Sequence, residues 1–241
     1  MTVSLLSNQL NYIFMSMDDS QRKTIDYSVL KYFELVLKLK AWFEKTSFVG
    51  NDEFYQKILR ANYKCKDFQD RLYFNDNEFV SLSLASSGQQ EAVWILNILN
   101  YFSAVNKKIF LIVEEPESHL YPESQMHMTD AISAFINGGG NSGLITTHSP
   151  YILGELNNLI LSEKTFEKTK NDVAVNKIIS KNTWIKRDKF QAFHVDNREI
   201  QNAIREKSGF IKDELIDGAS SEINRRGDEL IRLSHGKDED E

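Results

Sequence analysis

The chain has 241 residues, of which 41% are hydrophobic and 11% aromatic, so it can bury one large core and is not disordered by composition. Its formal charge of -6 argues against a broad basic surface as the main binding device. Its single cysteine, Cys65, excludes a disulfide framework and a cysteine metal site, and we expect a small semi-buried apolar residue there. Because no apolar run approaches the roughly 20 residues that span a bilayer, and residues 1–14 lack signal-peptide features, we expect a cytoplasmic protein without a membrane partner.

Helical and hairpin patterns fill the first part of the chain. Residues 24–45 carry apolar side chains at helical spacing and predict a helix, and a second helix is predicted over residues 52–65. Residues 71–84 form short β-prone runs on either side of Asn75-Asp76-Asn77, which is a turn signal, so a hairpin is predicted there.

The middle of the chain predicts a helix followed by a buried strand. Ser87 followed three residues later by Gln90 has the pattern of a capping box, which predicts a helix that starts near Gly88. Residues 109–113, IFLIV, are an uninterrupted apolar run, which is typical of a strand buried on both faces of a parallel sheet.

A second helix and strand follow. Pro122 suits the first position of a helix, which Asn137 and the glycines after it are expected to end. Residues 143–147, GLITT, predict the next strand, with His148 directly after it. The order strand, helix, strand implies a right-handed crossover with parallel strands, so Glu115 and His148 are expected to emerge at the same edge of one sheet.

The last third of the chain gives shorter signals. We predict a short helix after Pro150, a strand over residues 156–162 and further short strands over 173–180 and 190–195. A helix is predicted from about residue 209 to 233, followed by a charged tail.

Four motifs occur in order: ASSGQ at 85–89, LIVEE at 111–115, PESHLYP at 116–122 and TTHSP at 146–150. Together they resemble the signature motif, Walker B strand, D-loop and switch-histidine loop of the C-terminal lobe of an ABC-type ATPase head. The most similar group is the SMC-like and OLD-like bacterial ATPases, many of which act in DNA repair or phage defence.

The resemblance implies an α/β fold: a partial P-loop NTPase head with parallel central strands, a helical N-terminal segment and a C-terminal helix. Three parts are expected. Residues 1–70 form the helical segment, residues 71–165 the C-terminal ATPase lobe, and residues 166–241 short strands and a helix that complete the lobe.

The resemblance also assigns a phosphate-binding role to the serine-glycine turn. In the family this element binds the γ-phosphate of ATP held by the other subunit, which implies this role for Ser86, Ser87, Gly88 and Gln89. A helix N-terminus offers free amides and a positive dipole end, which favour phosphate. Taken alone, the same four residues are more often a plain capped helix.

Glu114, Glu115 and His148 receive separate roles from the resemblance. Glu114 would help to bind Mg²⁺, although the family usually has aspartate there, one methylene shorter. Glu115 would polarise the attacking water, and His148 would contact the γ-phosphate. The alternative interpretation is that Glu114 and Glu115 are solvated acids at a strand end and that His148 has a structural role. His119, in the D-loop, is equally compatible with a place at a dimer seam and with a structural role.

The phosphate cradle GxxxxGK[ST] does not occur in the 241 residues. In the family this Walker A motif lies upstream, so the sequence resembles a head without its first lobe, whose sheet would leave an apolar edge exposed. We therefore expect a homodimer or a split-head partner that carries a Walker A motif.

Two functions from different classes follow. The first is a Mg²⁺-dependent ATPase lobe that works as a dimer with ATP sandwiched between subunits, coupled to DNA or to an effector protein. The alternative is a catalytically inactive head that acts as a scaffold or regulatory module. A lesser possibility is direct DNA binding through the stretches KLKAWFEK at 38–45 and KNTWIKRDK at 181–189, in which lysines and aromatic residues alternate.

Overall fold

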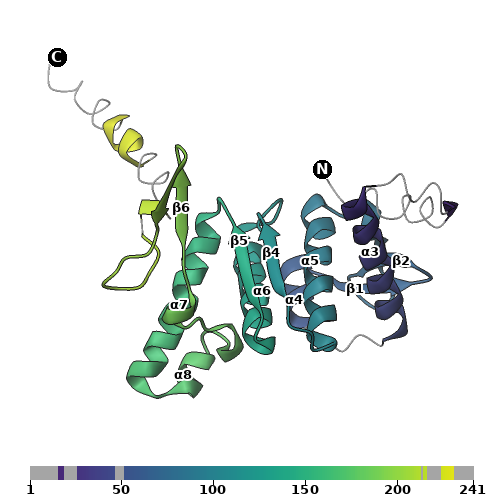
Figure 1. The fold of residues 1–241 in the computed structure, drawn as a ribbon, viewed down its shortest axis with the longest axis horizontal. Coiled ribbons are helices and arrows are strands. Elements are labelled where there is room, and N and C mark those ends of the chain that lie inside the picture. Colours follow the sequence, from purple (N-terminus) through teal and green to yellow (C-terminus); the bar gives the residue numbers. More distant parts are fainter. Residues whose placement is uncertain (1–15, 19–25, 47–51, 213, 216–223, 231–241) are drawn as a thin grey trace, which may run out of the picture. The chain divides into compact units, whose positions relative to one another are not determined.

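The computed structural model describes residues 16–18, 26–46, 52–212, 214–215 and 224–230 (Figure 1). The chain divides into two units, residues 1–147 and residues 148–241. Among the described residues, no helix combines the length and the apolar character that crossing a bilayer requires.

A three-stranded antiparallel sheet lies in the first unit, with β2 in the centre. Its strands are β1 (Asn62–Lys66), β2 (Gln69–Tyr73) and β3 (Phe79–Ser81). The predicted hairpin is confirmed, since β2 pairs with β3. The side chain of Asn75 accepts hydrogen bonds from the N–H groups of Asn77 and Glu78 at 3.0 and 2.9 Å, which fixes the turn between these strands.

The two predicted N-terminal helices are α3 (Tyr27–Lys45) and α4 (Asp52–Leu59). The start predicted at residue 24 lies outside the described residues. The prediction that the second helix continues to residue 65 is wrong, because Arg60 adopts a positive φ of 55° directly after α4. Beyond it Tyr63 and Cys65 point inward and Lys64 points outward, so this segment forms β1.

One hydrophobic core joins the helices of this unit to its antiparallel sheet. Helices α5 (Ser87–Ala104) and α6 (Pro122–Gly139) pack with α3 and α4, and Pro122 occupies the first turn of α6 as predicted. Helix α6 runs through Asn137 to Gly139 and ends at Gly140, which has a φ of 64°. The core includes the fully buried side chains of Leu39, Tyr55, Leu72, Leu96, Met128 and Ile132.

The predicted parallel pair is confirmed: β4 (Phe110–Glu114) and β5 (Ser142–Thr146) are parallel and α6 connects them (Figure 1). Glu114 lies opposite Thr146, so the carboxyl ends of both strands meet at one edge. A Cβ atom at Gly143 would approach Ile136 of α6 to 2.8 Å, which shows how closely α6 covers one face of this sheet.

The other face of the parallel sheet is open, and the prediction that β4 is buried on both faces is wrong. Phe110, Ile112 and Leu144 are 64%, 58% and 51% exposed. Leu111 and Ile145, which alternate with them, pack against the core. Only the face toward α6 is covered, so an apolar run that looks doubly buried in the sequence is half exposed.

A 20-residue helix, α7 (Pro150–Thr169), opens the second unit. The predicted strand over residues 156–162 is therefore wrong. Ile152, Leu156, Leu159 and Ile160 are buried at helical spacing, and they continue the helix that begins after Ser149. The hydroxyl of Ser149 caps the helix by accepting hydrogen bonds from the N–H groups of Tyr151 and Ile152, at 3.1 and 3.4 Å.

After α7 this unit contains α8 (Asp172–Asn176), the short 3₁₀ helices η2 (Lys181–Thr183) and η3 (Arg187–Lys189), β6 (Phe193–Asp196) and β7 (Glu199–Asn202). The strand predicted over residues 173–180 is wrong, because its first part is α8 and Asn171 caps it. The predicted strand near residue 193 is confirmed as β6. It pairs with β7, which the sequence reading missed, through a two-residue turn in which Asn197 and Arg198 both have positive φ.

The predicted C-terminal helix is only partly helical. Ile211 pairs with Ile204 as an isolated antiparallel bridge, and Asn157 binds the N–H of Ile211 at 2.8 Å and its carbonyl at 3.2 Å. These bonds hold residues 210–212 in an extended form against α7. Residues 224–230 are helical, while 216–223 and 231–233 lie outside the described residues.

Candidate functional site

The two adjacent acids at the end of β4 differ in backbone conformation, because Glu114 ends the strand and Glu115 is left-handed. Glu114 is exposed and alternates with buried Val113, so it lies on the open face of the parallel sheet with Phe110 and Ile112. Glu115 has a φ of 45° and donates its N–H to the carbonyl of Thr146 at 2.9 Å. A left-handed glutamate is strained by about 1–3 kcal/mol, and such strain is concentrated at functional sites.

The loop after Glu115 folds back toward the ends of both strands. Ser118 donates its N–H to the carbonyl of Glu115, and Leu120 donates its N–H to the carbonyl of Glu117, both at 2.9 Å. The hydroxyl of Thr147 donates to a carboxylate oxygen of Glu117 at 2.7 Å. The loop is therefore a compact turn joined to the residue that follows β5.

Helix α5 begins with a capping box one residue earlier than predicted. Ser86 is the N-cap, and its hydroxyl accepts from the N–H of Gln89 at 3.3 Å while the Gln89 side chain accepts from the N–H of Ser86 at 3.2 Å. The predicted pair of Ser87 and Gln90 is wrong, because Gln90 is buried and donates to the carbonyl of Ala85 at 2.8 Å.

The start of α5 is also fixed to the end of α4. The amide of Gln89 donates to the carbonyl of Leu59 at 2.7 Å, and the hydroxyl of Ser124 in α6 donates to the carbonyl of Ile58 at 3.1 Å. Two helix N-termini thus meet one helix C-terminus, which is a favourable arrangement of helix dipoles. Because the side chains of Ser86 and Gln89 are engaged within the chain, phosphate binding here would depend mainly on Ser87 and on backbone amides.

The serine-glycine turn lies directly against the loop that follows β4. A Cβ atom at Gly88 would overlap the carbonyl oxygen of His119, which itself has a φ of 59°. The structure therefore brings together Gly88 of the predicted signature element and His119 of the predicted D-loop. The motif predicted a phosphate-binding role for Gly88, and its contact with His119 was not predicted.

We expect Gly88→Ala to lower the free energy of unfolding by about 1–3 kcal/mol, the usual range for overpacking a tight site. The overlap with His119 should outweigh the helix-propensity gain of roughly 1 kcal/mol for replacing glycine by alanine. Urea unfolding measures the change. Gly154→Ala is the matched control, because a Cβ at this position in α7 meets nothing within 4 Å and should be neutral or stabilising. Equal stability of Gly88→Ala and the wild type would contradict the close contact.

His148 is exposed and is the first residue of the second unit, immediately after Thr147 in the chain. Its approach to Glu115 stays a prediction. Thr147 is the residue of this motif that the structure joins to the loop, and the sequence reading gave it no role. The position of Thr147 between the end of the predicted strand and His148 could have indicated such a role.

The described ranges contain no cluster of three His, Cys, Asp or Glu side chains suited to holding a metal ion. Mg²⁺ at phosphate-transfer sites is commonly bound by one or two carboxylates together with phosphate oxygens and water. Glu114, whose carboxylate is exposed at the strand end, could be one such carboxylate ligand.

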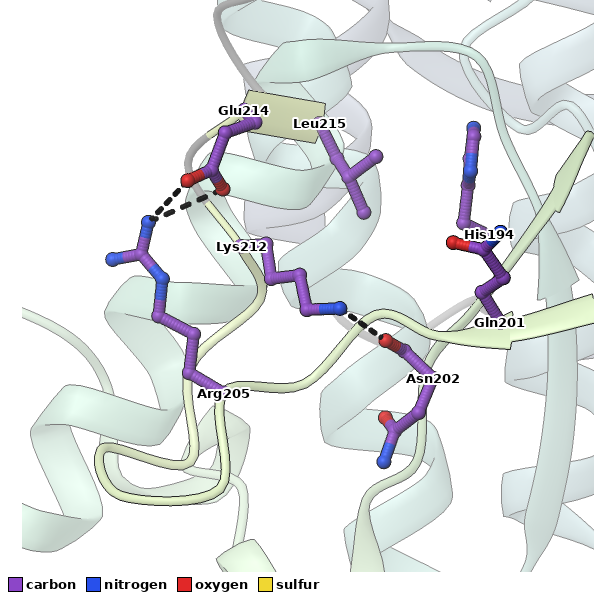
Figure 2. Close-up of a pocket in the computed structure, with 7 residues that line it drawn as sticks. All are labelled: His194, Gln201, Asn202, Arg205, Lys212, Glu214 and Leu215. Carbon is purple, nitrogen blue, oxygen red and sulfur yellow. Dashed lines mark hydrogen bonds and ion pairs between the residues drawn. The ribbon is translucent and has the colours of Figure 1, made fainter.

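A pocket of about 310 Å³ lies in the second unit beside the β6–β7 hairpin (Figure 2). Two of its basic side chains bind within the chain: Arg205 pairs with Glu214 at 3.3 Å, and Lys212 donates to the carbonyl of Asn202 at 2.7 Å. None of the residues predicted to bind ATP or Mg²⁺ lines this pocket. It therefore adds nothing to the site at the end of β4.

The two lysine-rich stretches do not form aromatic stacking surfaces. In the first, Lys40 is buried and ion-paired with Asp70 at 2.8 Å, while Trp42 packs edge to face against Phe43 and Tyr101. In the second, Trp184 is buried and donates its indole N–H to the carbonyl of Ile179 at 2.9 Å. The aromatic groups that suggested nucleic-acid stacking thus pack against the interior, with Phe43 and Trp184 buried and Trp42 half-buried.

Comparison with known proteins places most of the candidate site's chain segment in a family. The model of a family described as AAA ATPase domain matches residues 6–153, which is more than half of the chain and includes every residue predicted for the site. No curated protein and no solved structure matches the chain.

Proposed function

The chain belongs to the AAA ATPase domain family, and on that premise we propose that it binds ATP with Mg²⁺ and takes part in ATP hydrolysis as one lobe of an ABC-type head. The observation that carries the proposal is the packing of Gly88 against His119. This packing joins the serine-glycine turn to the loop that begins at strained Glu115. The element proposed to bind phosphate and the element proposed to activate water are therefore in direct contact.

Each side chain has a distinct role in this proposal. Ser87 and the amides at the start of α5, with Ser86, Gly88 and Gln89 shaping the turn, bind the γ-phosphate of a nucleotide held mainly by another subunit. Glu115 orients and polarises the attacking water, and His148 donates a hydrogen bond to the γ-phosphate. Glu114 would contribute a carboxylate to Mg²⁺, which when bound neutralises charge on the phosphates.

We propose that a second polypeptide completes the site. The sequence contains no GxxxxGK[ST] motif, which supplies the phosphate cradle and lysine in P-loop ATPases. The open apolar face of the parallel sheet, where Glu114 lies, is in keeping with a partner that covers this face. A split-head subunit with a Walker A motif would supply the cradle, with ATP between the subunits, whereas a second copy of the chain would cover the face without supplying it.

Coupling to DNA or an effector in DNA repair or phage defence follows from the SMC-like and OLD-like resemblance.

The second candidate is a scaffold or regulatory head that does not turn ATP over. It is favoured by the missing Walker A motif and by the internal engagement of Ser86 and Gln89, which leaves fewer side-chain groups for phosphate.

Mg²⁺-dependent ATP binding and phosphate release by the purified chain test the proposal. Turnover by the chain alone would support the first candidate and show that a recognisable P-loop is not required. Saturable binding without turnover would favour the scaffold. If neither is detected, the measurement is repeated with a polypeptide that carries the Walker A lobe. Turnover that appears only in the mixture supports the split head, and its continued absence overturns the proposed ATPase.

A further inference from the structure

The geometry points to Glu117 and Thr147 as a positioning pair that holds the left-handed turn of Glu115 at the end of β5. The hydroxyl of Thr147 donates to Glu117 at 2.7 Å across 30 residues of sequence, and both side chains are half-buried. The catalytic consequence of this inference rests on the proposed function, whereas the positioning itself does not.

The last residue of β5 and the residue after it hold two positions of the same loop. The carbonyl of Thr146 accepts the N–H of Glu115 at 2.9 Å, and the hydroxyl of Thr147 binds the side chain of Glu117. The first bond continues the backbone pairing of β4 and β5 by one residue beyond the last pair, Glu114 and Thr146. The second bond joins the two chain segments one residue further on, through side chains. The loop therefore cannot shift along β5 without breaking both bonds.

The strain at Glu115 explains why such a pair is needed. A left-handed glutamate relaxes toward an ordinary backbone conformation unless its surroundings hold it. Within the loop, the bonds Ser118 N–H to Glu115 O and Leu120 N–H to Glu117 O close the turn on itself. The bond from Thr147 attaches this closed turn to the sheet. Because its acceptor is a carboxylate, it is stronger than a bond between neutral groups.

The pair also links the two halves of the proposed chemistry. Thr147 immediately precedes His148 in the chain, and Glu117 lies two residues after Glu115. A displacement of the loop would therefore pull on the start of the segment that carries the histidine. The pair is expected to affect the geometry of the reacting groups rather than the affinity for nucleotide.

The test compares Thr147→Val, which keeps the shape and removes the donor, with Thr147→Ser, which keeps the hydroxyl. Amide hydrogen exchange at Ser118 and Leu120, measured by NMR on the full chain without nucleotide, reports the loop. We expect exchange at both amides to be about tenfold faster in Thr147→Val and near the wild-type rate in Thr147→Ser. Thr129→Val removes a hydroxyl bond to the carbonyl of Gln125 within α6 and should leave both amides unchanged.

Unchanged exchange in Thr147→Val would overturn the positioning pair, whatever the chain does with ATP. Equal acceleration in Thr147→Val and Thr129→Val would also overturn it, since that result indicates a general loss of stability.

ATP turnover tests the consequence separately, in the form of the protein that hydrolyses ATP. There Thr147→Val should lower kcat with little change in KM, and Thr147→Ser should restore kcat. A rise in KM alone would contradict a role in positioning Glu115. If no form of the wild type hydrolyses ATP, the proposed function fails, and the exchange rates still decide whether the pair holds the loop.

Discussion

Replacing Asp70 by alanine is expected to lower the free energy of unfolding of the first unit by about 3–5 kcal/mol, the usual cost of removing one partner of a buried ion pair. Asp70 on β2 is fully buried and pairs at 2.8 Å with Lys40 of α3, whose side chain is 2% exposed. It also accepts a hydrogen bond from the hydroxyl of Tyr63 at 2.6 Å. Its loss leaves the Lys40 ammonium in the core without its carboxylate, although the carbonyl of Phe68 accepts from it at 3.3 Å.

The single cysteine gives a second measurement beside urea unfolding. Cys65 lies opposite Asp70 in the β1–β2 pair and is 7% exposed. Burial, and after it the charge of Asp70, raise the pKa of its thiol to about 12, so at pH 8 the native protein offers little thiolate to a labelling reagent. Labelling at pH 8 should therefore be slow in the wild type. Asp70→Ala should accelerate it strongly, by easier opening of the hairpin and by removal of a charge that raises the pKa of the thiol, and urea unfolding separates the two effects.

The control for this prediction replaces the whole polar network. A variant that combines Lys40→Met, Asp70→Leu and Tyr63→Phe removes the charges together with the groups that depend on them. It should be much more stable than Asp70→Ala, because apolar replacement of a buried pair is often neutral. If Asp70→Ala unfolds at the same urea concentration as the wild type and labels no faster, the network does not stabilise this unit.

Glu115→Gln is expected to lower the rate of ATP hydrolysis by about 100- to 10,000-fold, the range for loss of a group that assists proton transfer. The neutral amide keeps the size of the side chain but loses the charge that polarises water. Nucleotide binding should be retained, since Glu115 acts on the attacking water in the proposed mechanism. Phosphate release and equilibrium ATP binding, measured side by side in the form that hydrolyses ATP, check both parts.

Two further variants sharpen this test. Glu114→Gln should raise the Mg²⁺ concentration needed for half-maximal activity, because the proposed metal carboxylate is lost. Glu167→Gln makes the same chemical change at an exposed residue of α7 that has no proposed role in the site, and it should have no effect. Hydrolysis at the wild-type rate in Glu115→Gln would remove this residue from the mechanism.

Elements with a strong local pattern could be predicted from the sequence, while elements decided by partners in the fold could not. Helices α5 and α6 and strands β4 and β5 followed from apolar spacing and from Pro122. Strand β1 is too short to show its alternation clearly, and its start depends on the left-handed Arg60. Helix α7 was divided wrongly because a short apolar run such as Leu159–Leu161 is compatible with both a strand and a buried helix.

The candidate site shows the same limit. The motifs predicted which residues to consider, and the parallel pairing confirmed that β4 and β5 end at one edge. The capping box was placed one residue late because Ser86 and Gln89 have the same spacing as Ser87 and Gln90, and burial of Gln90 decides between them. The bond of Thr147 to Glu117 depends on the mutual position of two strand ends, which no local pattern specifies.

The open face of the parallel sheet bears on how the protein behaves in concentrated solution. Phe110, Ile112 and Leu144 form an apolar surface next to two strand edges, so copies of the chain can stack there when no other cover is present. Sulfate and phosphate strengthen such association by raising the cost of exposed apolar surface. Crystals grown from these salts would favour lattices in which this face is buried. Glu114 lies on the same face, so nucleotide and Mg²⁺ soaked into such crystals would find that carboxylate covered, and ligands are better added before crystallisation.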